Sequence, residues 1–481
     1  MTRATSRSFN TALTELGQAA GVPLPECTLR AQDLSIDSRF RAAEGAAAAL
    51  AAGAGIANEI AQARGQSPGT IELASRHVEA SLLSFAHLRF NDPQAAPAAR
   101  LEPESRTAVA GFFATADNRW IYLHPGFPHN TAGLLQLLAV DDDRAAVRDK
   151  VAGCRAELLE DEIAAAGLCG AMVRTAQEWD ESAAGNLLDT CPVVDIVRIG
   201  DSDPEPFPTD HARPLAGCNV LDLTRILAGP TCARTLASYG ATALRVSAED
   251  LPSIPLFVTD TGFGKRACHL DLKTKVGRAV LQKLVGEADV FSQGYRSGAM
   301  DRLGFSPDEV ASQRPGIVYV SINCYGHEGH WSSRPGWEQL AQTVTGMAAQ
   351  QGADRTDGVP TLLPVAVNDY TTGYLAAFGT LVALQRRARN GGSYWVRVSL
   401  ARTAMWLRNL GLRPNTGRTP FRVRPLAEAE LERMSSHMDS TWGELRYLRP
   451  AVELSNVVVN WQAAPVPLGS HSPSFSSKKP G

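Results

Sequence analysis

Short apolar runs alternate with amphipathic helical segments through the second half of this 481-residue chain, and this alternation constrains its fold most. The runs have the length and β-branched content of buried strands. They lie at Asn219–Leu223, Ala241–Val246, Asp289–Gln293 and Ile317–Asn323, with helical patterns at Gly229–Tyr239 and Lys275–Glu287. Strands that alternate with helices form parallel sheets through crossover connections. The sequence therefore predicts a doubly wound α/β fold, with ligands at the carboxyl ends of its strands.

An acid lies where an apolar run meets a long helical pattern. The run ends on Asn368-Asp369, and the small and apolar residues that follow fall on one helical face. A basic turn and Asn390-Gly391-Gly392 end this helix, and Tyr394–Leu400 alternates as a strand does. Asp369 has two interpretations: an N-cap that accepts the first helical N–H groups, or a reactive carboxylate. The two are compatible, because a helix N-terminus favours the ionised acid.

Composition excludes several classes of protein. The content of 44% hydrophobic and 20% charged residues is ordinary for a globular chain, and the net charge of −3 argues against a broad nucleic-acid-binding surface. The eight cysteines form no Cys-x-x-Cys pair, which predicts reduced thiols rather than disulfides or a zinc site. No apolar run approaches the length of a membrane span, and we expect a cytoplasmic protein whose basic first residues are not a transit peptide.

The N-terminal third repeats part of the later pattern. An Ala-rich helical stretch at 41–64 precedes a Gly/Pro break, a short strand and another helix. Gln66–Leu82 then aligns with Gly391–Leu407, which suggests a partial internal duplication, although a chance likeness of two Ala-rich segments stays open. In this alignment Glu44 lies opposite Asp369. The Asn-Asp-Tyr context is absent there, so we assign Glu44 no catalytic role.

The segment between these parts predicts a smaller α+β domain. Residues 111–124 hold two apolar runs around Asp117-Asn118, the signal of a hairpin. Helical patterns follow at Thr131–Leu138 and Ala145–Ala166, and Val193–Ile199 has the character of a strand. His124 and His129 flank a Pro/Gly turn without a third partner at metal-ligand spacing, so we interpret them as surface or turn histidines and predict no metal site.

Motifs of the second half occur in the order of a known family. They are LDLTRILAGP (221–230), GKRACHLDLK (264–273), ADVFSQGYRSGAMDRLGF (288–305), VYVSINCYGHEGHW (318–331), RPGWEQLAQTVTG (334–346), and NDYTTGYLAAFGTLVAL with VRVSL (368–384 and 396–400). Together they resemble the family III CoA-transferases (the CaiB/BaiF group), which include formyl-CoA transferase and the carnitine CoA-transferases, with α-methylacyl-CoA racemase as a cousin. No G-x-G-x-x-G follows the first strand, which disfavours a nicotinamide or flavin enzyme.

The resemblance implies a Rossmann-like CoA-transferase core with its smaller α+β domain placed N-terminally. We expect an Ala-rich helical region at 1–105 (a degenerate copy of the end of the core), the small domain at 106–205, the core at 214–411, and a C-terminal segment at 412–481 with a disordered tail. It also implies a homodimer. The duplicated region offers an alternative, in which one chain supplies both surfaces.

The resemblance also assigns roles to residues. Asp369 corresponds to the nucleophile that carries the acyl group and then CoA. Glu338 corresponds to the acid beside it, which could orient the nucleophile or tune its pKa, and a plain surface glutamate is the alternative. The phosphates of coenzyme A, the thioester substrate, need cations from loops at strand ends. Five basic residues are expected there, although solvated loop charge is an alternative for each: Arg225, Lys265, Arg266, Arg296 and Arg302.

The chain departs from the family pattern in places that bear on its activity. Trp337 occupies the position of a histidine that the racemase cousin uses for proton transfer, which disfavours two-base racemisation. The loops at 293–298 and 329–331 also differ from the family motif. We therefore expect transfer of CoA between an acyl-CoA and a free carboxylic acid. The rivals are an acyl-CoA racemase or isomerase that uses Asp369 as a base, and a catalytically degenerate paralogue that only binds CoA.

Overall fold

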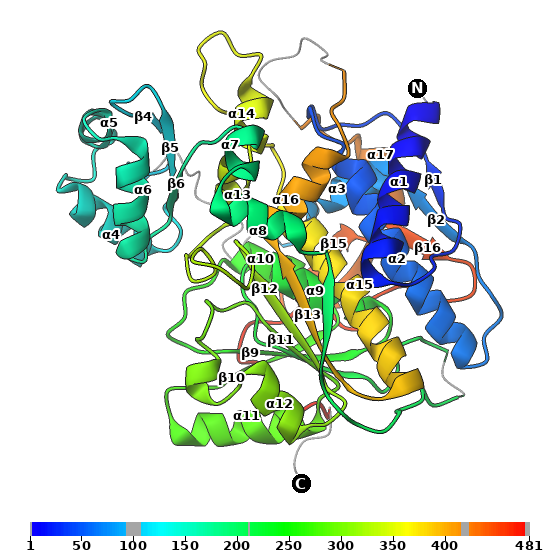
Figure 1. The fold of residues 1–481 in the computed structure, drawn as a ribbon. Coiled ribbons are helices and arrows are strands. Elements are labelled where there is room, and N and C mark those ends of the chain that lie inside the picture. Colours follow the sequence, from blue (N-terminus) through cyan, green and yellow to red (C-terminus); the bar gives the residue numbers. More distant parts are fainter. Residues whose placement is uncertain (1, 93–106, 210–211, 415–422, 477–481) are drawn as a thin grey trace.

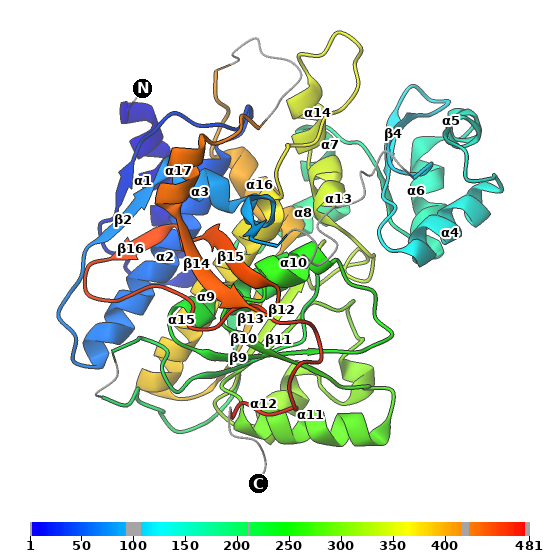
Figure 2. The same cartoon turned by 180° about the vertical axis from the view of Figure 1, so that it is seen from behind.

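The computed structural model describes residues 2–92, 107–209, 212–414 and 423–476. Figure 1 shows a large α/β body and a small unit, formed by α4 to α6 with β4 to β6, that projects at one side. In the reverse view of Figure 2, the N-terminal helices (blue) and the C-terminal strands (orange and red) lie on the same flank. Strand pairing joins these two regions, so the two ends of the described chain build one part of the molecule.

A seven-stranded sheet with the order β10-β9-β8-β11-β12-β13-β7 forms the centre of the large body. Its strands are β7 Asp195–Gly200, β8 Asn219–Asp222, β9 Thr242–Ser247, β10 Lys265–His269, β11 Val290–Gln293, β12 Val318–Asn323 and β13 Ser393–Ser399. All neighbours are parallel except β7, which is antiparallel to β13. The predicted doubly wound parallel sheet is confirmed. The strand expected at Val193–Ile199 pairs with this sheet and not with the small unit.

Helices cover both faces of the central sheet. Those of this body are α9 Ala228–Ser238, α10 Pro255–Asp260, α11 Lys275–Glu287, α12 Pro307–Gln313, α13 Glu338–Val344, α14 Met347–Gly352, α15 Val367–Asn390 and α16 Leu400–Asn409, with a 3₁₀ turn at Asp301–Leu303. Strand residues alternate between the faces. Leu221 and Phe291 pack in the cluster under α11 and α12, whereas Val220 and Val290 pack in the cluster under α9 and α15. The sheet is thus buried on both sides, as its apolar strands require.

The N-terminal region packs on α15. Its elements are α1 Thr2–Ala20, β1 Thr28–Arg30, α2 Ala42–Ala63, β2 Ile71–Ala74, α3 Ser75–Ser81, a 3₁₀ turn at Ser84–His87 and β3 Arg89–Phe90. The Ala-rich helix α2 is buried on nearly all sides between α1 and α15. Its small side chains allow this close packing, which explains an apolar composition all round a helix. The helix predicted at 41–64 is confirmed.

The C-terminal segment completes two small sheets of the N-terminal region. It contains α17 Glu428–Met434, β14 Ser435–Ser440, β15 Gly443–Leu448 and β16 Val452–Leu454. The sheets have the orders β1-β2-β16 and β14-β15-β3. The run GELRYL (443–448) forms β15, whereas the run VELSNVVVNW (452–461) is a strand only over Val452–Leu454.

The small unit has its own apolar core. It consists of β4 Gly111–Ala114, β5 Trp120–Leu123, β6 Gly170–Met172, α4 Pro128–Leu138, α5 Arg144–Ala152 and α6 Ala156–Ala165. The predicted hairpin is confirmed as β4-β5. The single helix expected at Ala145–Ala166 is wrong: it breaks after Ala152, and Asp117 of the hairpin accepts a hydrogen bond from the Ala156 N–H at the start of α6 (3.3 Å). A carboxylate from the hairpin thus accepts a backbone hydrogen bond at the start of the second helix.

Two further helices, α7 Ala176–Asp180 and α8 Ala183–Thr190, lead from the small unit back to β7. All eight cysteines are free thiols. No helix in the described part of the chain has the length and apolar character needed to cross a bilayer.

Candidate active site

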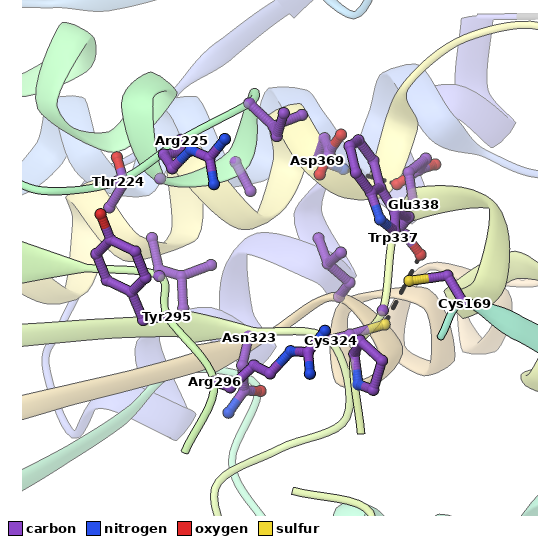
Figure 3. Close-up of a pocket in the computed structure, with 18 of the residues that line it drawn as sticks. Cys169, Thr224, Arg225, Tyr295, Arg296, Asn323, Cys324, Trp337, Glu338 and Asp369 are labelled. Atoms are coloured by element: carbon purple, nitrogen blue, oxygen red, sulfur yellow. Dashed lines mark hydrogen bonds between the residues drawn. The ribbon is translucent and has the colours of Figure 1, made fainter. Parts of the chain in front are cut away.

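A cavity of about 290 Å³ opens at the carboxyl ends of β8, β11 and β12 (Figure 3). Loops of the core form most of its wall, and Phe127, His129, Asn130 and Cys169 of the small unit form the rest. The core residues that line it include Thr224, Arg225, Ile226, Tyr295, Arg296, Asn323, Cys324, Arg334, Trp337, Glu338 and Asp369. This edge of a doubly wound sheet is where ligands bind in such folds.

Asp369 reaches the cavity from the first turn of α15. The helix begins at Val367, and its N-cap is Ala366, which makes no side-chain cap. The N-cap interpretation of Asp369 is therefore wrong, because the residue is the third of the helix. Its side chain is 7% exposed and lies against the cavity, beside Glu338 (Figure 3). A carboxylate in the first turn still benefits from the helix dipole.

Glu338 performs the capping from another helix. As the first residue of α13, it accepts hydrogen bonds from the backbone N–H groups of Asn368 (3.1 Å) and Asp369 (2.9 Å). The amide Nε2 of Gln342 donates a third, at 2.7 Å. The Gln342 Oε1 in turn accepts from the Leu363 N–H (2.8 Å). Three donors hold the Glu338 carboxylate at the start of α15, which favours its ionised form.

The two carboxyls share one buried environment. Burial raises the pKa of Asp369, and burial together with the Asp369 charge raises the pKa of Glu338. Repulsion between two buried carboxylates is mutual, so the group that ionises second carries it. Because three N–H donors stabilise the Glu338 anion, we place the first negative charge on Glu338 and the second on Asp369. The Asp369 carboxylate is consequently more basic than an exposed one.

Trp337, at the motif position where the resemblance places a histidine of the racemase cousin, stacks on His124. Their rings stack with centroids 4.6 Å apart. His124 is buried rather than at the surface, which corrects that part of its interpretation. Its Nδ1 accepts from the Gly126 N–H (2.9 Å), so the ring proton lies on Nε2, which donates to Gln339 Oε1 (3.1 Å). Burial lowers the pKa of His124 to about 3, and the ring is neutral.

Two of the five predicted basic residues line the cavity. The Arg225 guanidinium lies over the Phe127 ring, 4.8 Å from its centroid, and Arg296 donates to the Gly167 carbonyl at 2.9 Å. Neither forms an ion pair with a carboxylate in the described ranges. Each arginine thus contacts the small unit and keeps its positive charge directed at the cavity (Figure 3).

The other three lie elsewhere. Lys265 and Arg266 belong to strand β10 and not to a loop. Lys265 is 3% exposed, and its Nζ donates to Asp222 Oδ2 and the Pro230 carbonyl, both at 2.7 Å. Arg266 donates to the Ser474 carbonyl (3.0 Å), and Arg302 is exposed on a 3₁₀ turn. A short β-strand after a glycine was not distinguishable from a loop by sequence pattern.

Several residues that line the cavity or hold its acids escaped the sequence analysis. Arg334 lines the wall, although its charge is engaged by Asp161 (2.8 Å) and Glu160 (3.7 Å). Gln342 carried a signal, since a glutamine four residues after Glu338 lies on the same helical face. Phe127 and Cys169 carried none, because only the tertiary fold brings them to the cavity. Among the described residues, no cluster of potential metal ligands is present.

Comparisons with known proteins extend these observations. Residues 215–423 match the model of CoA-transferase family III. An acetyl-coenzyme A transferase of Hypoxylon pulicicidum is 33% identical over 326 residues, 63% of this chain and 54% of that protein. An acyl-CoA transferase of Gibberella moniliformis is 33% identical over 317 residues, 61% of this chain and 55% of that protein. The chain thus spans about half the length of these curated relatives.

Solved structures also match part of this chain. The crystal structure of Rv3272 from Mycobacterium tuberculosis shows 30% sequence identity with a TM-score of 0.39, over 42% of this chain and 59% of that one. The family resemblance inferred from the ordered motifs is confirmed by the matching family model. The part of this chain that matches CoA-transferase family III is residues 215–423.

Proposed function

We propose that the protein transfers CoA from an acyl-CoA thioester to a free carboxylic acid through covalent intermediates on Asp369. The observation that carries this proposal is the placement of the Asp369 carboxyl at the cavity, next to Glu338, which caps the same helix. A buried carboxylate with a raised pKa is a stronger nucleophile than an exposed one once it is ionised. The matching family and the transferase names of the relatives support the reaction class.

The reaction follows from one nucleophile used repeatedly. The Asp369 carboxylate attacks the thioester carbonyl, which forms a mixed anhydride and releases the CoA thiolate. The thiolate attacks the Asp369 carbonyl, which gives an aspartyl-CoA thioester and frees the first acid. The acceptor carboxylate attacks this thioester, and a second anhydride forms as the thiolate leaves. The thiolate then attacks the acceptor carbonyl, which yields the new acyl-CoA and restores Asp369.

Arg225 and Arg296 supply the charge that these substrates need. Both the CoA phosphates and the acid substrates are anions, and neither arginine has a carboxylate partner in the described ranges. We assign coenzyme A the part of a substrate carrier, held by these two residues during turnover. Glu338 keeps the first backbone N–H groups of α15 occupied, so that Asp369 stays a free nucleophile and is not consumed as a cap.

A homodimer is part of the proposal by family resemblance. The described chain places Phe127, His129, Asn130 and Cys169 of its own small unit in the cavity wall, so a second copy is not required to line this part of the site. Light scattering coupled to size exclusion, with activity measured across a dilution series, distinguishes a site that needs a second copy from a site that is complete within one chain. A dimer whose activity per chain is independent of dissociation indicates that each chain holds a complete site.

The racemase rival needs two proton carriers, one on each face of the α-carbon. Trp337 carries no exchangeable acid or base group, and both ring nitrogens of the neutral His124 are engaged. These observations favour transfer. Incorporation of solvent deuterium at the α-carbon of an acyl-CoA, without an added acceptor acid, would instead favour the rival.

The decisive experiment is chemical trapping during turnover. Purified protein is mixed with an acyl-CoA and treated with hydroxylamine or borohydride, and peptides are examined by mass spectrometry. We expect modification at Asp369 and nowhere else. Asp161→Asn, which changes an exposed acid near the cavity, serves as the matched control and should trap like the parent. An unmodified residue 369 under conditions of measured turnover contradicts the nucleophile role.

A further inference from the structure

The loop that carries Arg225 into the cavity has a strained backbone. Ile226 has φ of 66°, in the left-handed region. A β-branched residue is rarely found there, because its side chain collides with the neighbouring backbone. Such a conformation persists only when its surroundings enforce it. Thr224, Arg225 and Ile226 all line the cavity, so the strain lies within the candidate site.

The side chain of Lys265 forms hydrogen bonds to both ends of this loop. The loop runs from the end of β8 at Asp222 to the first turn of α9, which contains Pro230. The Lys265 Nζ donates to Asp222 Oδ2 on one side and to the Pro230 carbonyl on the other, both at 2.7 Å. The lysine is 3% exposed and the aspartate 0% exposed, so the ion pair is shielded from water. Lys265 therefore fixes the distance that the loop must span.

Further contacts inside the loop hold its shape. Asp222 Oδ1 accepts from the Thr224 N–H (3.0 Å) and also from the Thr224 hydroxyl. The loop closes back on the helix so tightly that a Cβ on residue 229 would collide with Thr224, which explains Gly229. The Arg225 guanidinium then donates to the Pro252 carbonyl and lies over Phe127. With these contacts fixed at both ends, the chain between them has little freedom to relax.

We propose that Lys265 is a positioning residue: its bridge between Asp222 and Pro230 holds Ile226 in the left-handed conformation and thereby directs Arg225 into the cavity. The lysine does not touch substrate in this arrangement, although sequence analysis placed it among the CoA contacts. Without the bridge, Ile226 relaxes to negative φ and the guanidinium leaves the cavity. This inference rests on the proposed role of Arg225 in binding the anionic substrate.

The test removes the bridge without leaving a lone buried charge. Asp222→Asn/Lys265→Met replaces both partners, because removal of one alone would leave the other uncompensated. We expect the Kd for coenzyme A, measured by calorimetry, to rise about tenfold, as in Arg225→Ala. The KM for acyl-CoA should rise in parallel, with kcat within about threefold of the parent. The exposed pair Lys273 and Asp250 provides the matched control, Asp250→Asn/Lys273→Met, which should bind CoA normally.

Rescue distinguishes positioning from a general structural role. Glycine adopts φ near +66° without strain. Ile226→Gly added to the Asp222→Asn/Lys265→Met variant should therefore restore CoA binding to within about threefold of the parent. Ile226→Gly should also raise the melting temperature of the parent by about 3 °C more than it raises that of the Asp222→Asn/Lys265→Met variant, because only the parent still holds Ile226 in the strained conformation. This second readout does not depend on ligand binding.

The outcomes separate the inference from the function on which it rests. Parent affinity in Asp222→Asn/Lys265→Met, with weak binding in Arg225→Ala, overturns the inference alone. Parent affinity in Arg225→Ala overturns the assigned role of Arg225 and the inference with it. If the ion-pair variant does not fold, Ile226→Pro decides, because proline imposes negative φ while the bridge stays intact. Unchanged affinity for CoA and an unchanged KM for acyl-CoA in Ile226→Pro would contradict the inference.

Discussion

Two long buried helices, α15 and α2, carry an acid at the same position. Asp369 is the third residue of α15 and Glu44 the third residue of α2, and the two helices pack against each other (Figure 1). The residues before them share a backbone conformation: Ala366 has φ −82° and ψ 59°, and Arg41 has φ −85° and ψ 52°. Neither helix has a side-chain cap at that residue. The scaffold around the two acids is thus alike.

The neighbours of the two acids differ. Glu44 is 1% exposed and forms ion pairs with Arg413 (2.6 Å) and Arg41 (3.5 Å). Asp369 faces a cavity and has another carboxylate, Glu338, beside it. Cations neutralise one acid, and a second anion makes the other more basic. A position at a helix start therefore does not make an acid reactive; its charged neighbours decide.

The likeness continues beyond the helices. After α2 the chain forms β2 and then α3, and after α15 it forms β13 and then α16. The sequence alignment that placed Glu44 opposite Asp369 also places the first residue of α3 opposite the first residue of α16. The internal duplication stays a prediction, and these matching element starts support it. Under that interpretation α2 keeps the packing role of its counterpart without the chemistry.

The largest effect should come from Asp369→Asn. An amide cannot attack a thioester as the carboxylate does, so we expect transfer to fall at least about a thousandfold, with the fold retained. Steady-state transfer of CoA to an acid panel measures it, and circular dichroism checks the fold. Glu44→Gln should leave kcat within about twofold. Equal losses in both variants would break the comparison.

Glu44→Gln should instead reduce stability. The substitution leaves Arg413 and Arg41 without their buried carboxylate, and we expect a loss of about 3 kcal/mol in the free energy of unfolding. Denaturant titration measures this loss. Glu59→Gln, a change at a half-buried acid of the same helix, is the control and should cost about 1 kcal/mol or less. A stable Glu44→Gln protein would show that the ion pairs are not what holds α2 at this end.

Glu338→Gln should shift the pH dependence of transfer. Removal of the neighbouring charge lowers the pKa of Asp369, so the fall in kcat/KM on acidification moves to lower pH. We also expect the plateau to fall about tenfold to a hundredfold, because a less basic carboxylate is a weaker nucleophile and one N–H of α15 loses its acceptor. An unshifted acid limb would mean that the two carboxyls do not interact.

The smallest effect is on the pH dependence of stability. A carboxyl whose pKa is raised by folding stabilises the protein below its unfolded pKa, and this contribution is lost as pH rises through the folded pKa. Asp369→Asn removes the titrating group. The free energy of unfolding of the variant minus that of the parent should therefore increase from pH 5 to pH 8 by roughly 1 to 3 kcal/mol. If this stability difference is the same at pH 5 and at pH 8, ionisation of Asp369 does not destabilise the native state.

Sequence patterns predicted the core of the fold because its strands and helices have distinct local periodicities. The helix α11 begins and ends where its apolar pattern does, at Lys275 and Glu287. Asp369 and Glu338 were placed by motif order. The hydrogen-bond partners of these two acids were not predicted, because the bonds from the Asn368 and Asp369 N–H groups to Glu338 join segments some thirty residues apart. Lys265 shows the same limit, because a charged residue after a glycine predicts exposure unless its buried partner is known.

The pairing of β16 with β2 has a consequence for the order of events during synthesis. Val452–Leu454 forms the antiparallel edge of a sheet whose other strands lie among the first hundred residues. That sheet stays incomplete until residue 454 has left the ribosome, and contacts between such distant segments form slowly. Until then, the edge of β2 that pairs with β16 stays open. A nascent chain stalled after residue 411 should expose that edge to chaperones or to aggregation.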